Sequence, residues 1–284
     1  LTQPGDKVLI QTPVYNHFFT SIHNSGCQAA ESPLVYRDNT YTIDFDDLER
    51  KAADPAVKLM LLCNPHNPAG RVWTPAELHR IGELCLRHDV VVVADEIHCE
   101  LVMPGFRYTP FASLCEEFER RSVTCTSPSK AFNLAGLQVA NIFAADAALR
   151  ARIGHSLQIN ETGEIGPFAI EALIAAYDEG AEWLDALNEY LHGNYRFSRE
   201  YFDRNLPQYP VLPLEGTYLV WVDCRASGLT SDELETKLLE EAKLRINPGA
   251  IYGEAGRDFI RLNIACPQRT LGEGLERLRK VLAR

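Results

Sequence analysis

The stretch Val90-Val-Val-Val-Ala-Asp-Glu-Ile-His98 is an unbroken apolar run that ends in charged and polar residues. A run of this kind suits a strand with both faces buried, because a half-exposed strand would alternate apolar and polar residues. Such strands are typical of parallel sheets that helices cover on both faces. We therefore expect Val90–Asp95 to be a central strand, with Asp95 at its carboxyl end.

Other segments of the first half repeat this pattern. Four more apolar or β-branched runs predict strands at Val8–Ile10, Val57–Cys63, Val123–Thr126 and Val139–Ala144. Amphipathic helical patterns lie between the runs, at Asn16–Asn24, Phe45–Ala53 and Pro75–His88. Thr74 and Glu77 form a predicted capping box at the start of the last helix, with Pro75 in its first turn. The alternation predicts an α/β fold with a mostly parallel central sheet.

The second half of the sequence has a different pattern. Residues 146–206 are nearly all helical by period, with breaks at 163–167 and Gly180. The patterns that follow predict strands at 217–223 and 258–265 and helices at 231–245 and 271–282. We expect two domains, a large one over 1–185 and a small α+β one over 186–284, joined by a long helix around 182–205.

Composition excludes some classes of partner. The formal net charge of −11 disfavours nucleic acids and anionic membranes, which usually require a basic surface. Eight cysteines without any C-x-x-C pair predict free thiols in a reducing compartment, and no metal site. No targeting segment or long apolar span is visible, so we expect a cytoplasmic protein. The sequence starts without methionine and runs at once into the strand-like residues 7–13, which predicts a start inside a domain.

Polar side chains follow three of the predicted strands. Lys130 ends the segment Ser127-Pro-Ser-Lys, and a lysine amine at a buried strand end is a good nucleophile toward aldehydes, because desolvation disfavours its charged form. Asp95 lies where open α/β sheets bind ligands. Asn67 lies in the proline-rich turn 64–70, which could hold its amide rigidly. Taken alone, each residue also has an ordinary structural explanation. Lys130 could be a surface lysine, Asp95 could cap a loop, and Asn67 could belong to a simple turn.

Arg261 interrupts the apolar stretch FIRLNIACP near the end of the chain. Buried arginine needs a partner, and its planar guanidinium binds a carboxylate with two parallel hydrogen bonds. The strand context leaves two readings open, a substrate carboxylate or an internal salt bridge.

Together, in this order, these segments resemble the fold-type I pyridoxal-phosphate (PLP) enzymes of the aminotransferase class I/II superfamily. Within it, NPHNPAGRVW, ADEIHCELV, SPSKAFNLAGL and RLNIACP resemble the MalY/PatB branch of cystathionine β-lyase-like carbon–sulfur lyases. The similarity spans nearly the whole chain. It implies a PLP-binding large domain, an amino-acid substrate and a homodimer. It also implies that the N-terminal segment typical of the family is missing from this sequence.

The resemblance also implies roles for individual residues. Lys130 would carry PLP as a Schiff base and move the proton at the substrate Cα, and Asp95 would pair with the pyridinium nitrogen. Asn67 would bind the phenolic oxygen of the cofactor beside the substrate. The other implied contacts are Tyr15 on the pyridine ring, Ser127 and Ser129 near the phosphate, and Arg261 on the substrate carboxylate. His98 at the cofactor and Gln138 near the phosphate replace a tyrosine and an arginine of many aminotransferases.

The implied reaction is α,β-elimination of L-cystathionine or a related cysteine S-conjugate to thiol, pyruvate and ammonia, with Tyr15 as an acid. An aminotransferase uses the same residues and differs in where the proton returns, so a need for a keto-acid acceptor discriminates the two. A third reading is a non-catalytic PLP-binding or regulatory module, which the set Lys130, Asp95, Asn67 and Arg261 disfavours.

Overall fold

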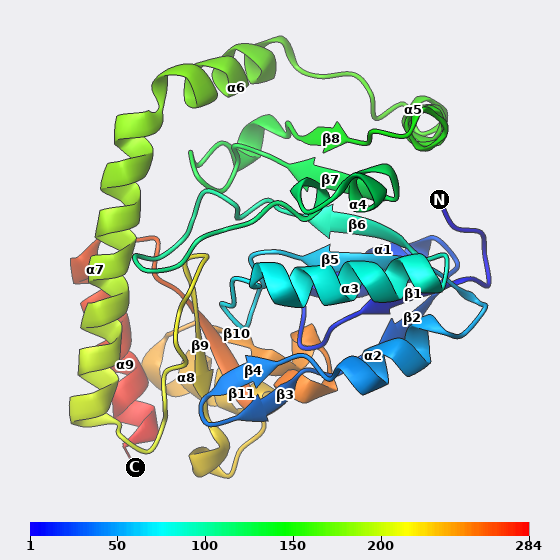
Figure 1. Ribbon diagram of the computed structural model, residues 1–284. Helices are drawn as coiled ribbons and strands as arrows, with labels where there is room; N and C mark the ends of the chain where they lie inside the picture. The colour runs from blue at the N-terminus through cyan, green and yellow to red at the C-terminus, as the bar shows by residue number, and fades with distance from the viewer. Residues whose placement is uncertain (284) are drawn as a thin grey trace.

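The main sheet carries the strands that the apolar runs predict. The computed structural model describes residues 1–283, and Figure 1 shows its arrangement. The sheet has the order β2-β1-β5-β6-β7-β8 and is parallel except for the last pair. Its strands are β1 (Lys7–Ile10), β2 (Gln28–Glu31), β5 (Val57–Cys63), β6 (Val91–Asp95), β7 (Ser122–Thr126) and β8 (Asn141–Phe143). The predicted α/β fold with a mostly parallel sheet is thereby confirmed.

Helices cover both faces of this sheet. Alternate residues of β5 divide between the faces: Leu59 packs with the side chains of α1 (Asn16–Asn24), and Met60 packs with those of α3 (Pro75–Arg87). The α3 face also holds α2 (Phe45–Ala52) and α4 (Glu116–Arg120), and α5 (Ala147–Ile159) lies on the α1 side of β6. Strands buried on both sides require continuous apolar sequence, which explains the valine run of β6.

The predicted capping box at the start of α3 is present. The hydroxyl of Thr74 accepts from the backbone N–H of Glu77, and the Glu77 carboxylate accepts from the N–H of Thr74 at 2.8 Å. The two bonds satisfy N–H groups that a helix start otherwise leaves without partners.

Some elements differ from the expectation. The predicted strand Val139–Ala144 is shorter, as β8, and it runs antiparallel to β7. The edge strand β2 and the hairpin of β3 (Val35–Arg37) and β4 (Thr40–Thr42) were not predicted. Their sequences, QAAE and two runs of three residues, are too short or too weakly patterned for a period-2 signal. Five short 3-10 helices were also missed: Phe111–Ser113, Ala135–Leu137, Arg225–Ser227, Gly249–Tyr252 and Glu254–Gly256.

The second half contains the predicted helices. After α6 (Pro167–Glu179), the long helix α7 (Ala181–Asn205) runs along one side of the molecule (Figure 1). A small antiparallel sheet has the order β10-β11-β9, and two helices pack with it against α7. These elements are β9 (Leu219–Asp223), α8 (Ser231–Ala242), β10 (Asn247–Pro248), β11 (Phe259–Asn263) and α9 (Gln268–Leu282).

The predicted division into two domains at residue 185 stays a proposal. Side chains of the small sheet, Trp221 and Phe259, belong to the same core as strands β5 and β6 of the main sheet. Polar contacts also link the two parts, since the Arg71 guanidinium binds the Glu215 carboxylate at 3.0 Å. The main sheet and the small sheet are therefore held in a defined relation, and the site lies between them.

Two further expectations concern the whole chain. All eight cysteines are free, as predicted, and four of them are buried: Cys27, Cys63, Cys85 and Cys224. Over residues 1–283, none of the helices combines the length and the apolar character needed to cross a membrane.

Candidate active site

Six of the predicted site residues border one cavity, at the carboxyl ends of the parallel strands. The cavity, called here the strand-end cavity, has a volume of about 200 Å³. Its lining comprises Tyr15, Cys63, Asn67, Asp95, Ile97, His98, Lys130, Tyr218, Leu219, Arg261 and Asn263. Parallel strands end at the same edge of a sheet, so β5, β6 and β7 bring side chains from distant parts of the sequence together there.

The loop after β5 holds Asn67 in place. The Asn64 backbone N–H donates to the Asp95 carbonyl at 3.0 Å, and the His66 ring nitrogen Nε2 bonds the Pro13 carbonyl at 2.8 Å. Gly70 closes the turn in the left-handed region, at a φ of 70°, which glycine adopts without strain. The predicted rigid turn is therefore present, and the Asn67 side chain points into the cavity from it.

Asp95 ends β6 at the floor of the cavity. One carboxylate oxygen accepts from the Ile97 backbone N–H at 3.2 Å. Burial raises the pKa of Asp95 to about 6, while this hydrogen bond and the nearby Lys130 ammonium act in the opposite direction. A carboxylate that is buried with so few partners has capacity for a cationic group in the cavity.

The neighbouring carboxylate, Glu96, points away from the cavity and supports the loop beneath it. It is fully buried and accepts from the Phe111 backbone N–H at 2.9 Å and from the Tyr108 hydroxyl. Burial raises the pKa of Glu96, and both hydrogen bonds lower it. The neighbouring carboxylates of Asp95 and Glu96 therefore have different surroundings: Asp95 lines the cavity, and Glu96 binds the loop that contains Tyr108 and Phe111.

His98 lies in the cavity wall, edge to face with Tyr218 at a ring-centroid distance of 5.7 Å. Burial, together with the positive charges of Lys130 and Arg261, lowers the pKa of His98 to about 3. The ring is therefore neutral near pH 7. Its buried Nδ1 has no hydrogen-bond partner within residues 1–283, so it is available to a group in the cavity.

Lys130 follows β7 in a half-buried loop and lines the strand-end cavity. Within the described chain its amine makes no hydrogen bond and no ion pair. Of the two serines before it, Ser127 donates to the Val139 carbonyl at 2.6 Å and accepts from the Ser129 backbone N–H at 3.1 Å. Ser129 borders a second cavity rather than this one. The phosphate role of both serines stays a prediction.

Arg261, on β11, has neutral partners. Its guanidinium donates to the Asn67 amide oxygen at 3.1 Å and to the Asn247 amide oxygen at 3.3 Å, and it lies 4.9 Å from the centre of the Tyr252 ring. No carboxylate of residues 1–283 forms an ion pair with it, so the alternative of an internal salt bridge is wrong for that part of the chain. A mostly buried guanidinium without a counter-ion is a site for an anion.

Asn67 and Arg261 act as a unit because of this contact. The Asn67 oxygen accepts from Arg261, which leaves the amide N–H groups of Asn67 free to donate into the cavity. The two residues are 194 positions apart in the sequence. Their contact joins the main sheet to the small sheet across the site.

Tyr15 lies between β1 and α1 and lines the strand-end cavity. Burial raises the pKa of Tyr15, as does the nearby Asp95 carboxylate, so the phenol stays protonated near pH 7. A protonated phenol can donate a hydrogen bond or a proton, in agreement with the predicted acid role.

Some residues of the site had not been predicted. Tyr218, Asn247, Tyr252 and Asn263 surround Arg261 or line the cavity. Of these residues, Tyr218 alone could have been suspected from the sequence, because it is a tyrosine directly before the apolar strand LVWVD. The others lie in turns and strand ends that resemble any loop sequence.

The whole chain has relatives of known family. Residues 1–278 match the family Aminotransferase class I and II. Cystathionine beta-lyase PatB of Bacillus subtilis is 44% identical over 282 residues, which cover 99% of this chain and 73% of PatB. Protein MalY of Escherichia coli is 35% identical over 281 residues, covering 96% of this chain and 70% of MalY.

A solved structure agrees with the sequence relatives. Cystalysin from Treponema denticola, which contains pyridoxal 5'-phosphate, superposes with a TM-score of 0.95 at 38% identity, over 99% of this chain and 72% of cystalysin. These similarities confirm the resemblance drawn from the four motifs, and the chain belongs to the aminotransferase class I and II family, in the branch of PatB and MalY.

Proposed function

We propose that the protein is a PLP-dependent carbon–sulfur β-lyase that cleaves L-cystathionine or related cysteine S-conjugates. The observation that carries the proposal is the single cavity where Lys130, Asp95, Asn67 and Arg261 meet. PatB, at 44% identity, is named for cystathionine beta-lyase, and cystalysin contains PLP. The reaction converts a thioether and one water into a thiol, pyruvate and ammonium.

The polar groups of the strand-end cavity fit PLP. Asp95 is a mostly buried carboxylate with one hydrogen bond, and a protonated ring nitrogen would be its missing partner. The free N–H groups of Asn67 and the unpartnered His98 Nδ1 face a space that a hydroxylated ring would fill. Lys130 supplies an amine for the aldehyde. When bound, PLP acts as an electron sink for the pair released at Cα.

The chain's own groups then have separate tasks. Arg261 holds the α-carboxylate, so the substrate Cα–H bond has one orientation toward Lys130. With substrate in place, the amine of Lys130 would be free and would take the Cα proton. The protonated phenol of Tyr15 can give its proton to the departing sulfur. His98, neutral near pH 7, adds no positive charge beside Lys130.

The experiment that tests the function measures pyruvate release from L-cystathionine by the PLP-loaded protein, without any keto acid. Pyruvate release is the expected result. If pyruvate is absent and turnover begins on addition of a keto acid, the proposal is wrong and the protein is an aminotransferase.

Replacing Arg261 by lysine should raise KM for the amino-acid substrate and change kcat little. Lysine keeps the positive charge but loses the planar fork, so we expect a fall in kcat/KM of about 10- to 100-fold. Steady-state kinetics with L-cystathionine measure the effect. Arg245→Lys, at an exposed arginine, is the matched control. A normal KM in the Arg261 variant would contradict the carboxylate assignment.

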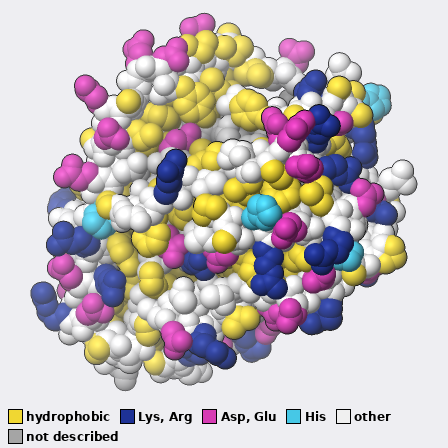
Figure 2. All heavy atoms as spheres, in the orientation of Figure 1, with side chains coloured by type: hydrophobic (Ala, Val, Ile, Leu, Met, Phe, Trp, Pro, Cys, Tyr) yellow, Lys and Arg dark blue, Asp and Glu magenta, His cyan; other side chains and the backbone are white. Residues whose placement is uncertain are grey.

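We also propose that the protein is a homodimer. Support comes from an exposed apolar face around α6, where hydrophobic side chains gather at the top of Figure 2. Phe168 is 79% exposed and Ile159 is 67% exposed. Continuous apolar surface of this kind usually marks an interface.

A cytoplasmic location is proposed as well, supported by the eight free thiols.

The substitution Phe168→Asp should shift the protein from dimer toward monomer, because it places a charge in the proposed interface. Light scattering during size-exclusion chromatography measures the molar mass. Leu239→Asp, at a 47% exposed leucine on α8, should leave the mass unchanged. Equal masses for both variants and the unmodified protein would remove α6 from the interface.

A further inference from the structure

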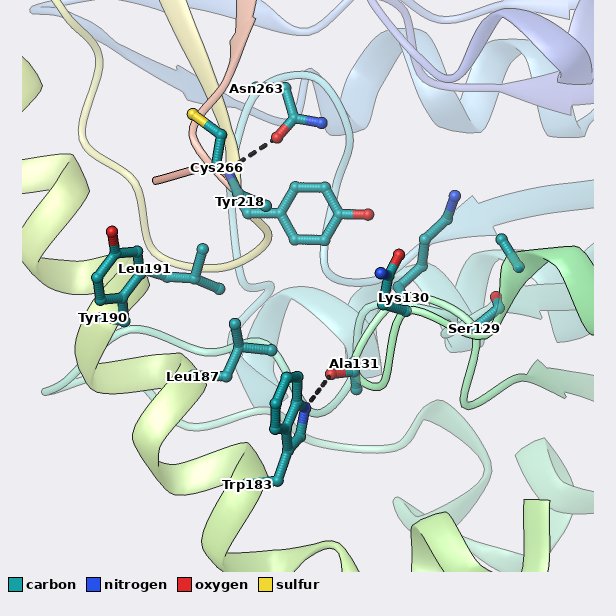
Figure 3. A pocket seen from close by; sticks show the side chains of 13 residues that line it. Ser129, Lys130, Ala131, Trp183, Leu187, Tyr190, Leu191, Tyr218, Asn263 and Cys266 are labelled. Carbon is teal, nitrogen blue, oxygen red and sulfur yellow. Dashed lines mark hydrogen bonds between the residues drawn. The ribbon is translucent and has the colours of Figure 1, made fainter. Parts of the chain in front are cut away.

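A larger cavity adjoins the strand-end cavity on the side of the long helix. This second space, called here the α7 cavity, has a volume of about 350 Å³. Figure 3 shows Trp183, Leu187, Tyr190 and Leu191 projecting into it from α7, opposite Lys130. The two cavities share three lining residues: Lys130, Tyr218 and Asn263. The α7 cavity therefore opens next to the Lys130 amine, which would face the reacting carbon of the substrate.

The wall from α7 is apolar and aromatic. Trp183 is fixed there, since its indole N–H donates to the Ala131 carbonyl at 3.3 Å. The Tyr190 hydroxyl already accepts from the Gln268 backbone N–H at 2.8 Å, and its ring remains for contact. On the other wall, Tyr218 extends between α7 and Lys130 (Figure 3). A flat or bulky apolar group would contact aromatic rings on two sides.

Charge is nearly absent from the lining. Of the 13 lining residues, all within the described chain, Lys130 alone carries a charged side chain. The Lys130 amine takes part in the reaction at the substrate Cα, so it is not a permanent ion-pair partner for a charged group at the far end of the S-substituent. An ammonium or carboxylate packed against the wall from α7 would lose part of its hydration without gaining an ion pair from that wall, which is unfavourable.

The position of the bound amino-acid substrate determines that its side chain enters the α7 cavity. The substrate amino group would replace the Lys130 amine at the cofactor, and the substrate carboxylate would bind Arg261. The β-carbon and its sulfur therefore need the remaining space near Lys130. A third cavity, of about 230 Å³, touches Arg261 and Asn263 but lacks Lys130 in its lining. Of the two cavities that adjoin the strand-end cavity, the α7 cavity is the one lined by both Lys130 and Asn263.

We propose that the α7 cavity receives the S-substituent of the cysteine conjugate and selects uncharged apolar or aromatic substituents over charged ones. The inference rests on the proposed lyase function and narrows its substrate class. An apolar protein cavity of about 150 Å³ can hold a benzene ring, so a benzyl-sized group fits. Cystathionine instead places an ammonium and a carboxylate at the far end of its substituent. In the reaction the Cβ–S and Cα–N bonds break, one water is consumed, and thiol, pyruvate and ammonium form.

The test compares kcat/KM for S-benzyl-L-cysteine with that for L-cystathionine, from pyruvate release by the PLP-loaded enzyme. We expect the benzyl conjugate to be favoured by about tenfold or more. Because both substrates are measured on the same preparation, their ratio does not depend on the fraction of folded enzyme. A ratio at or below one would overturn the inference.

Two variants locate the effect. Trp183→Ala removes a 57% exposed side chain, and Leu187→Asp adds a charge to the cavity wall. Each should lower the benzyl-to-cystathionine ratio by about tenfold or more, mainly through KM of the benzyl substrate. Ala186→Asp puts the same charge on the exposed neighbouring position of α7, outside the lining, and should leave the ratio unchanged.

The outcomes separate this inference from the proposed function. Unchanged ratios in both cavity variants, with pyruvate still produced, would overturn the cavity assignment alone. An absence of pyruvate from both substrates in the unmodified enzyme would overturn the lyase function and the inference with it.

Discussion

Replacing Lys130 by alanine is expected to abolish carbon–sulfur cleavage and the absorbance change of PLP on addition of substrate. The variant loses both the amine that holds the aldehyde and the base that removes the Cα proton. A positioned general base alone contributes about 10²–10⁴-fold, so we expect pyruvate release to fall by at least about 10³-fold. Absorbance spectra and pyruvate assays measure the two effects.

A lysine elsewhere on the main sheet provides the control. Lys58 is exposed on β5, and Lys58→Ala should keep both the spectrum and the activity. Borohydride reduction of the PLP-loaded protein, followed by peptide mass analysis, should find the cofactor on the peptide that contains Lys130. Cofactor on another lysine, or an intact spectral response in Lys130→Ala, would refute the Schiff-base assignment.

Replacing Asp95 by asparagine is expected to impair catalysis strongly while PLP still binds. Asparagine can accept the Ile97 backbone N–H, but it provides no negative charge for the ring nitrogen. Loss of one preorganised electrostatic contact typically lowers kcat by about 10²–10³-fold. Measurement of kcat at saturating PLP tests this, and a kcat within a few-fold of the original would contradict the pairing.

The same substitution should stabilise the protein when PLP has been removed. Folding raises the pKa of Asp95 from 3.8 to about 6, so the folded chain binds this proton more tightly than the unfolded chain. The free energy of unfolding therefore falls as pH rises from about 4 to 6, and the cost is fully present above that window. Two pKa units correspond to about 3 kcal/mol as an upper bound.

Urea unfolding of the two PLP-free proteins at pH 4 and pH 8 measures this difference. Asp95→Asn should be more stable than the original at pH 8, by about 1–3 kcal/mol. At pH 4 the difference should fall to about 0.5 kcal/mol, because the folded carboxyl is protonated while the unfolded one, near its ordinary pKa, is about half ionised. A pH-independent difference would show that burial of the Asp95 charge carries no cost.

The long, strongly patterned elements were predictable from the sequence. Val57–Cys63 and Asn16–Asn24 have the predicted bounds, because an apolar run or a helical period reports burial within one element. The edge strand β2 and the β3–β4 hairpin were not predictable in this way. The register of β2 depends on pairing with another part of the chain, since its Gln28 lies opposite Lys7 of β1. The strands of the hairpin have three residues each, too few for a period to show.

The site, too, could be predicted from the sequence only in part. Lys130, Asp95 and Asn67 follow parallel strands, and topology alone places such residues at one edge of the sheet. Whether Arg261 had an internal salt bridge or a free guanidinium could not be decided from the strand FIRLN. That answer depends on Asn67 and Asn247, which reach it from other segments.

The sequence by itself determined the parallel sheet, the long helix and the residues at the strand ends, because these follow from periods and turns within a few neighbouring residues. The tertiary structure alone decided which side chains meet. It placed Tyr218 between two cavities, gave Arg261 neutral partners and lined the α7 cavity with Trp183 and Leu187. Contacts between different elements of the fold depend on how those elements pack, and no local pattern in the sequence records that packing.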